Sequence, residues 1–409
     1  MDRYQPAFEG HYVGQGGLIS PFEILDHLER LVACQSVFGQ EYECGLLLSD
    51  MAREEGLTVD IQPVADRREN ILISWGADSY LSDKHGLLLH GHYDTVPALD
   101  MPQAFDVKIR DGQLWGRGSV DQKGGLVAAL AALIAMKRLG RPMKRSLCLA
   151  SVVDEESEHR GSYALAQSGI QADYAIVTEP THLHKVEFGC RGSIPLRIRV
   201  EGKTAHAGSA SQGVNAIQKA LPILEGLFAL DYRPLDLGDL GQVTASLCVS
   251  IMEAGTGYNN VPHQALIWMD RRTVPGEDKA LVMEEIEAVL DQARLIDPSL
   301  KAHLEVARPD WSWPPIIERG LNPTLTPADS PLFTLLEAAA AKSGMDKLDK
   351  AFASCYYDMD FLVNDLGIPS LVYGPGDGRL NHSARESIAL DHVCQAADIF
   401  SHLAEALCL

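Results

Sequence analysis

One stretch decides the fold class: GLLLHGHYDTVP, Gly86 to Pro97. It opens with a short apolar run, Leu87 to His90, which is typical of a strand buried on both faces of a parallel sheet. The run ends directly in His92 and Asp94. In open α/β sheets ligands bind beyond the carboxyl ends of the strands. The stretch therefore predicts a central strand that delivers polar side chains to a site.

Similar short apolar strands, alternating with helices, are predicted in the first 180 residues and again near the C-terminus. Further strands are predicted at Asn70–Trp75, Ser146–Val153, Tyr174–Val177 and Ser370–Tyr373. Helices are predicted at Pro21–Cys34, Tyr42–Glu55, Asp121–Leu139, Ser330–Ala341 and Leu390–Leu407. Buried strands that alternate with helices predict an α/β sandwich in which helices cover both faces of a mostly parallel sheet.

The middle of the chain has a different pattern from about Gly192 onward. Two-residue alternation, typical of half-exposed strands, occurs at Ser193–Val200, Gln242–Ile251 and Ala265–Arg272, and helices are predicted at Ser211–Leu230 and Glu277–Ala293. We therefore expect an inserted two-layer α/β domain at residues 192–307. The catalytic domain is then discontinuous, with residues 1–191 and 308–409, and the Pro- and Trp-rich Pro309–Pro327 links back to it.

Composition excludes several classes of protein. The chain has 409 residues, 46% hydrophobic and 22% charged, which is the profile of a globular protein with room for two domains. A net charge of −21 argues against nucleic-acid binding, which needs a basic face. The eight cysteines are scattered without a C-x-x-C pair, which favours free thiols in a reducing cytoplasm over a disulfide framework.

No segment predicts export or membrane insertion. The N-terminus, Met1 to Pro6, lacks the basic and apolar regions of a signal peptide. The longest apolar run, Leu126–Met136, is shorter than the about 20 residues that a membrane span needs. We expect that run to be a buried helix and the protein to work without a membrane.

Five segments carry metal-type side chains just after apolar, strand-like runs: GHYDTVP (Gly91–Pro97), GRGSVDQKGG (Gly116–Gly125), VVDEES (Val152–Ser157), IVTEPT (Ile176–Thr181) and LNHSARES (Leu380–Ser387). They offer imidazole and carboxylate groups and no thiolate, a set that suits two hard-to-borderline divalent cations. The chemistry indicated is metal-assisted hydrolysis.

Each motif also has a plainer interpretation. Asp121 alone reads as a helix N-cap, but the pair Gly124-Gly125 costs roughly 1 kcal/mol per glycine in a first helical turn and suggests close backbone approach. The adjacent acids Glu155 and Glu156 fit a solvated acidic turn equally well, or a metal ligand beside a general base. The joint signal of five segments favours the metal site.

In their order and spacing, the five segments resemble the co-catalytic zinc aminoacylase and carboxypeptidase family, with members such as acetylornithine deacetylase and succinyl-diaminopimelate desuccinylase. The resemblance runs from about Pro21 to the C-terminus. It implies a zinc-exopeptidase-like catalytic domain with an inserted lid and dimerisation domain. The implied cofactors are two divalent metal ions, zinc by family default, while cobalt or manganese could bind the same ligands.

The resemblance also implies a role for each residue. The metal ligands would be His92, Asp121, Glu156, Glu179 and His382, and Asp121 would bridge both ions. Glu155 would be the general base, and Asp94 would orient His92 through its second ring nitrogen. The peptide bond after Asp121 is often cis in this family. Asp154 receives no chemical role.

The inserted domain carries further matches. GKTAHAG (Gly202–Gly208) resembles the family's lid motif, whose His206 would stabilise the oxyanion in the active site of a partner subunit. By itself His206 reads as an ordinary histidine between a strand and a helix. Contacts to the substrate carboxylate are implied for Asn260, Arg272, Gly374 and Gly376. The protein is therefore expected to be a homodimer.

Two stretches depart from the family pattern. Ser157–Arg160 stands where a glycine pair is common, and Ala353–Asp358 differs from the acetylornithine type. The metal set is untouched, so we expect an amidohydrolase of small N-acyl amino acids. A metallo-dipeptidase or carboxypeptidase could use the same site. A catalytically silent binding module is the third possibility, which the complete set of ligands and Glu155 disfavours.

Overall fold

The computed structural model describes residues 18–345 and 347–409, and the chain divides into two compact units. The first unit comprises the chain up to Gly189, Leu325–Phe352 and Tyr357–Leu409. The second unit comprises Cys190–Thr324 and Ala353–Tyr356. The N-terminal Met1 to Pro6, where the sequence lacks a signal-peptide pattern, lies outside the described residues.

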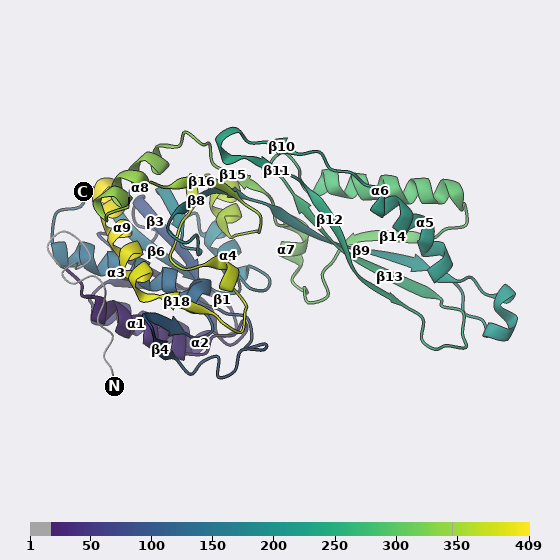
Figure 1. The fold of residues 1–409 in the computed structure, drawn as a ribbon, viewed down its shortest axis with the longest axis horizontal. Helices are drawn as coiled ribbons and strands as arrows, with labels where there is room; N and C mark the ends of the chain where they lie inside the picture. Colours follow the sequence, from purple (N-terminus) through teal and green to yellow (C-terminus); the bar gives the residue numbers. More distant parts are fainter. Residues whose placement is uncertain (1–17, 346) are drawn as a thin grey trace. The chain divides into compact units, whose positions relative to one another are not determined.

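A nine-stranded sheet forms the centre of the first unit (Figure 1). Its order is β1-β2-β6-β3-β7-β17-β8-β15, with β16 paired to β8. The strands are β1 (Thr58–Ala65), β2 (Arg68–Trp75), β3 (His85–His92), β6 (Ser146–Val152), β7 (Ala172–Val177), β8 (Lys185–Cys190), β15 (Thr324–Leu325), β16 (Asp349–Ala353) and β17 (Ser370–Val372). The neighbours β6, β3, β7 and β17 are parallel, whereas β1, β2 and β8 join antiparallel. The predicted parallel sheet is thus confirmed at its centre, and antiparallel strands extend it.

Helices bury both faces of this sheet. On one face Leu88 and Ala150 pack in a cluster with Leu165 of α4 (Arg160–Ser168). On the other face α3 (Gly124–Leu139) and α9 (Leu390–Cys408) contact β3 and β6. Because successive side chains of a strand point to opposite faces, this explains the uninterrupted apolar run Leu87–Leu89, which is fully buried. The remaining long helices of the unit are α1 (Pro21–Ala33), α2 (Tyr42–Glu54) and α8 (Pro331–Lys342).

One described helical segment, Ser119–Leu139, is long and apolar enough to cross a membrane, and the whole apolar window is buried inside the protein. Its helix α3 contacts α9, β3 and β6. Its apolar surface on all sides is therefore that of a core helix, as the sequence predicts.

A small three-stranded sheet lies in the same unit. It contains β4 (Lys108–Arg110), β5 (Gln113–Trp115) and β18 (Ser387–Ala389), in the order β18-β5-β4. Ser387 pairs with Trp115. This pairing brings the segment GRGSVDQKGG beside LNHSARES, although some 270 residues separate them.

The second unit is a two-layer sandwich. Its antiparallel sheet runs β12-β13-β9-β14, and α5 and α6 contact the sheet and enclose one hydrophobic cluster with it. The elements are β9 (Gly192–Glu201), α5 (Ala216–Phe228), β12 (Ser246–Ala254), β13 (Gln264–Thr273), α6 (Lys279–Ile296), β14 (Ala302–Val306) and α7 (Pro314–Arg319), with the two-residue pair β10 (Leu235–Asp236) and β11 (Gln242–Val243). Helix α5 begins later than the predicted Ser211, because Asn215 caps it by accepting from the N–H groups of Ile217 and Gln218.

The second unit is larger than the predicted inserted domain, residues 192–307. Backbone hydrogen bonds tie the following stretch to β9: Ala307 N–H donates to Pro195 O at 3.1 Å, and Ser193 N–H donates to Leu321 O at 2.9 Å. Arg191 N–H donates to Cys355 O at 3.2 Å. Residues 308–324 and 353–356, assigned from sequence to the catalytic domain, therefore pack with the second unit.

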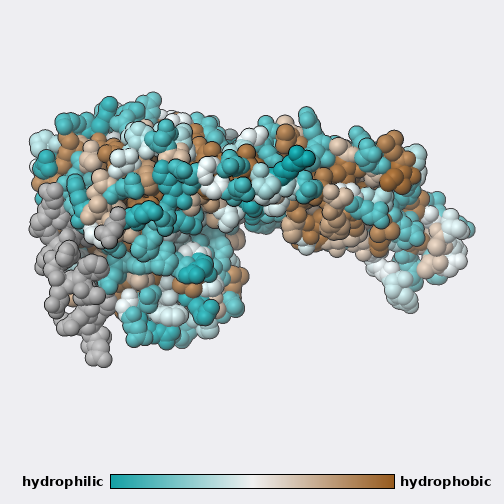
Figure 2. All heavy atoms as spheres, turned by 45° about the horizontal axis from the view of Figure 1, so that its top comes forward, coloured by the Kyte–Doolittle hydropathy of each residue, from teal (hydrophilic) through white to brown (hydrophobic). Residues whose placement is uncertain are grey.

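Apolar side chains are exposed on the helices of the second unit (Figure 2). On α5 they are Ile217, Leu221 and Phe228, the last 71% exposed. Their spacing of four and seven residues places them on one helix face. The buried side chains of α5, Ala216, Ala220, Ile223 and Leu227, form its other face. Helix α5 is thus apolar on two faces, and within residues 18–345 and 347–409 only one of them is covered.

Candidate active site

The polar residues predicted from sequence lie at the carboxyl ends of the parallel strands. Strand β3 ends at His92, β6 ends just before Asp154-Glu155-Glu156, and β7 ends two residues before Glu179. Asp121 lies in the helical turn Ser119–Lys123 that precedes α3, and His382 lies between β17 and β18. Parallel neighbours end at the same edge of the sheet, so the five segments meet there.

His92, Asp121 and Glu179 form a first group. His92 Nε2 lies 3.0 Å from Asp121 Oδ1 and 3.5 Å from Glu179 Oε1. All three side chains are buried. A second group contains Asp121, Glu156 and His382, in which His382 Nε2 lies 3.2 Å from Asp121 Oδ2 and 3.0 Å from Glu156 Oε1. The two oxygens of Asp121 therefore face different groups.

These two groups fit the two metal ions that the sequence predicts. In each, one ligand atom per residue lies within 4.8 Å of the others. Each group supplies one imidazole and two carboxylates, donors that divalent zinc, cobalt and manganese accept. Asp121 belongs to both groups, as a bridging ligand must.

Several ligands of the two groups have a raised pKa, so cations compete with protons for them. Hydrogen bonds to Asp121 and Glu156 raise the pKa of His382 to about 10. Burial, with the charges of Asp121 and Glu156 nearby, raises the pKa of Glu179 to about 8. Burial alone would lower the pKa of His92, but its acceptors Asp121, Asp94 and Glu179 raise it well above its usual value. Because metal ligands must lose their protons, cation affinity falls as the pH falls.

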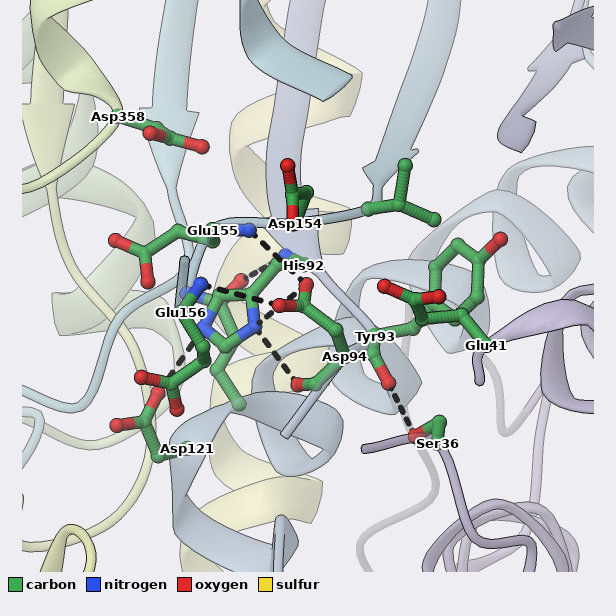
Figure 3. A network of polar contacts seen from close by, with 12 residues as sticks. Ser36, Glu41, His92, Tyr93, Asp94, Asp121, Asp154, Glu155, Glu156 and Asp358 are labelled. Atoms are coloured by element: carbon green, nitrogen blue, oxygen red, sulfur yellow. Dashed lines mark hydrogen bonds and ion pairs between the residues drawn. The ribbon is translucent and has the colours of Figure 1, made fainter. Parts of the chain in front are cut away.

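Asp94 has a second task that the sequence did not indicate (Figure 3). As expected it contacts His92, although Nδ1 lies closer to the backbone carbonyl of Asp94, 3.0 Å, than to the carboxylate, 3.4 Å. The carboxylate accepts the backbone N–H of Glu155 at 3.2 Å and that of Glu156 at 3.1 Å. It thus fixes the turn that carries both glutamates.

We expect Asp94→Asn to lower turnover by about 10- to 100-fold while both cations stay bound. The amide keeps one acceptor and turns the other into a donor, which opposes the N–H of Glu155 or Glu156. Steady-state kinetics with metal analysis checks this, with the exposed Asp100→Asn as the control. An unchanged rate in Asp94→Asn would show that the carboxylate does not hold the turn.

Glu155 lies beside the two groups, half-buried at the start of this turn. Loss of solvation raises the pKa of its carboxyl well above the usual value; His92 opposes this, and the negative charges of Asp358, Glu179 and Glu156 add to it. A carboxylate whose proton affinity is raised is suited to accept a proton from water.

Asp154, which received no chemical role from the sequence, has a structural role. Its Oδ1 lies 2.6 Å from Arg68 Nη2, and the same guanidinium also binds the buried Glu41. The ion pairs anchor the acidic turn to β2, which supports the structural assignment.

The glycine pair after Asp121 is explained by packing. A Cβ atom on Gly125 would lie 2.2 Å from Thr178 O, and one on Gly124 would lie 2.7 Å from Ser119 O. The peptide bond between Asp121 and Gln122 is cis, as the resemblance implies. The Gln122 side chain accepts the N–H of His92 at 2.6 Å. The turn is thus closely packed against β3 and the end of β7.

Comparison with known proteins identifies the family. A model described as peptidase family M20/M25/M40 matches residues 88–406. The chain belongs to this family. It is therefore a metal-dependent amide hydrolase, as the metal site predicts.

The M20 chain has similar relatives with different activities. It is 27% identical to an acetylornithine deacetylase of Myxococcus xanthus over 332 residues, 80% of this chain and 81% of that protein. A tripeptidase of Staphylococcus aureus has a similar structure, with a TM-score of 0.74, 20% identity, and coverage of 95% of this chain and 100% of that chain. A dinuclear metal-binding M20 peptidase of Bacillus subtilis matches with a TM-score of 0.69 and 15% identity over 95% of this chain and 98% of its own.

The structure gives a reason for the first departure of the M20 chain from the family pattern. His159, within the departing stretch Ser157–Arg160, has a left-handed backbone with φ 54°, a conformation that favours glycine. Its Nδ1 lies 2.8 Å from Asp358 Oδ1, and Ser162 Oγ donates to Asp358 Oδ2 at 2.6 Å. Asp358 belongs to the second departing stretch. The two unusual stretches therefore bind each other, which no local pattern in the sequence indicates.

The remaining predicted residues of the M20 chain fall in two places. Gly374 lies beside Glu179, because a Cβ atom there would lie 2.7 Å from Glu179 O, and Gly376 has φ +96°. In the second unit His206 and Asn260 are partners in a β-bridge, and His206 is exposed. Arg272 donates to Asp270 Oδ2 at 2.8 Å and lines a cavity of about 340 Å³ together with Trp268 and Trp311.

Proposed function

We propose that this M20 chain hydrolyses the amide bond of N-acyl amino acids and releases the acyl group. The observation that carries the proposal is the pair of three-residue groups that share Asp121, with Glu155 beside them. The likeness to an acetylornithine deacetylase over most of both chains supports the substrate class. Zinc is the proposed native metal, with cobalt or manganese able to replace it.

Two bound cations would supply Lewis acidity that polarises the scissile carbonyl and lowers the pKa of the attacking water. Five residues would hold them: His92, Asp121, Glu156, Glu179 and His382. Glu155 takes one proton from the water at a carboxylate oxygen as the water oxygen bonds to the acyl carbon. When the C–N bond breaks, Glu155 returns this proton to the amine nitrogen. The proton taken from water thus ends on the amine, and the electron pair of the C–N bond leaves with the nitrogen. The reaction needs no other reactant.

The substrate carboxylate needs donors. From the family resemblance, Asn260, Arg272, Gly374 and Gly376 are each proposed to contact it. The guanidinium of Arg272 is a strong partner for a carboxylate, since two of its N–H groups match two oxygens. Asp270 already accepts from Arg272 Nε, which orients the side chain.

We propose that the protein acts as a homodimer in which His206 stabilises the oxyanion in the site of the partner subunit. The exposed imidazole of His206 supports this, as do the apolar side chains of Ile217, Leu221 and Phe228, which are exposed on one face of α5. Strand β12 is an edge of its sheet and is also available for pairing. Free thiols at Cys34, Cys44, Cys148, Cys248, Cys394 and Cys408 support a reducing compartment such as the cytoplasm.

Replacing His206 with alanine should lower turnover by about 10²- to 10³-fold, because one oxyanion donor is lost. Exposed His303 provides the matched control, His303→Ala. Mixing His206→Ala with Glu155→Gln tests the partner role. Each variant alone is inactive, but a mixed dimer has one site with both residues intact, so activity should return on subunit exchange. Dimers that exchange and stay inactive, or a fully active monomer, would contradict it.

A screen of amine release tests the substrate class. Metal-loaded enzyme is offered acetyl-, succinyl- and formyl-amino acids beside dipeptides and tripeptides, and released amine is measured. We expect the highest kcat/KM among the N-acyl amino acids. A clear preference for the peptides would replace this proposal by the metallo-dipeptidase or carboxypeptidase alternative, which the similar fold of the tripeptidase keeps open.

A further inference from the structure

A buried ion pair lies behind the bridging aspartate. Arg117 Nη1 donates to Glu386 Oε2 at 2.5 Å. Arg117 is 1% exposed and Glu386 is fully buried. Arg117 comes from GRGSVDQKGG and Glu386 from LNHSARES, two of the five ligand-bearing segments. Neither residue binds a cation in the scheme above.

The second carboxylate oxygen of Glu386 binds the backbone that carries Asp121. Oε1 accepts the N–H of Val120 at 3.0 Å and the N–H of Asp121 itself at 3.2 Å. These donors lie at the start of a turn whose φ and ψ are not helical at Asp121 and Gln122. N–H groups at the start of a helical turn have no acceptor within the turn, and Glu386 supplies one.

Arg117 extends the contact to a third segment. Its Nε donates to Pro97 O at 3.2 Å, and Nη2 donates to Ala98 O at 3.1 Å. Pro97 ends the segment GHYDTVP, which carries His92 and Asp94. One ion pair thus links the segments of His92, Asp121 and His382, which contribute to both metal groups.

We propose that Arg117 and Glu386 are positioning residues that set the affinity for the two cations by fixing the backbone of Asp121. The inference rests on the proposed function only in that Asp121 bridges the cations. Hydrogen bonds to an ionised carboxylate are stronger than those to a neutral acceptor. A weaker or missing acceptor leaves two buried N–H groups poorly satisfied, and Asp121 loses its fixed position. Partners that orient metal ligands in this way typically contribute 10- to 100-fold in affinity.

The test is Glu386→Gln, measured by cation binding and not by turnover alone. Metal-free protein is titrated with Zn²⁺ in competition with a chromophoric chelator, without substrate. We expect Kd to rise by about 10- to 100-fold in Glu386→Gln. At saturating Zn²⁺ most of the wild-type turnover should return.

A matched control separates positioning from simple destabilisation. Glu285→Gln weakens another Arg–Glu pair, in which the fully buried Arg271 donates from Nε to Glu285 Oε1 at 3.0 Å, in the second unit. It should lower thermal stability and leave Kd unchanged. If Glu386→Gln binds Zn²⁺ like the wild type, or loses binding only in proportion to its unfolded fraction, the proposal is overturned.

A second variant, Arg117→Lys, tests the same proposal if Glu386→Gln does not fold. Arg117→Lys retains the charge opposite Glu386 but cannot reach both Pro97 O and Ala98 O. Its Kd should rise, by less than that of Glu386→Gln, and wild-type affinity would contradict the clamp between segments. The amine-release screen is independent. Weakened Zn²⁺ binding in a protein that cleaves no N-acyl amino acid would uphold the positioning role and remove the proposed substrate.

Discussion

Replacing Glu155 with glutamine should lower turnover by about 10²- to 10⁴-fold, the usual contribution of a general base. The amide cannot accept the proton that water must lose, and it has none to return to the amine. The side chain keeps nearly the same volume, and the turn stays held by Asp94 through backbone N–H groups that the substitution leaves in place. Both cations should therefore remain bound, and KM should change little.

Glu158→Gln is the control for Glu155→Gln. Glu158 lies in the same turn, but its carboxylate binds Arg160. This variant removes the same charge from the turn and should keep turnover within several-fold of the wild type. Metal analysis beside the kinetics decides the case. A Glu155→Gln enzyme with near-normal turnover would refute the assignment of the base.

Replacing Asp121 with alanine should remove both cations and lower activity by about 10³-fold or more, because metal ions contribute several kcal/mol to transition-state stabilisation. Asp121 belongs to both groups, and its two oxygens face His92 and His382 separately. Without it, neither group keeps three ligands. Elemental analysis of the folded variant should find no tightly bound cation.

His382→Ala sharpens this prediction. His382 belongs only to the group with Glu156, so this variant should lose one cation and keep the one held by His92, Asp121 and Glu179. Asp377→Asn, which alters a carboxylate that binds Arg379 on the same loop, should keep both. Two tightly bound cations in Asp121→Ala would show that Asp121 is not the bridging ligand.

The sequence predicted those features that depend on local pattern. Apolar runs that end in His92, Glu155 or Glu179 indicated buried parallel strands and the edge where the site lies, and the fold class is confirmed. The family resemblance is confirmed as well. The close packing at Gly124 and Gly125 was also predicted from the sequence, because glycine is unfavourable in a first helical turn unless the backbone must approach another segment closely.

Features that depend on distant contacts could not be predicted. The carboxylate of Asp94 binds a turn some 60 residues away, and Glu386 binds one some 265 residues away. No spacing rule links such positions. Likewise, residues 308–324 join the second unit through hydrogen bonds to β9, although their composition suggests only a linker. His159 occupies a backbone region that favours glycine because its side chain gains Asp358 as a partner.

The number of cations that each folded chain binds tests the central claim most directly. Metal-free protein is titrated with Zn²⁺, and bound metal and the rate of amine release from an N-acyl amino acid are followed together. The account predicts two cations per chain, no hydrolysis in the metal-free protein, and full activity only when both groups are filled. A folded chain that binds no cation, or that hydrolyses the substrate equally well without one, would contradict it.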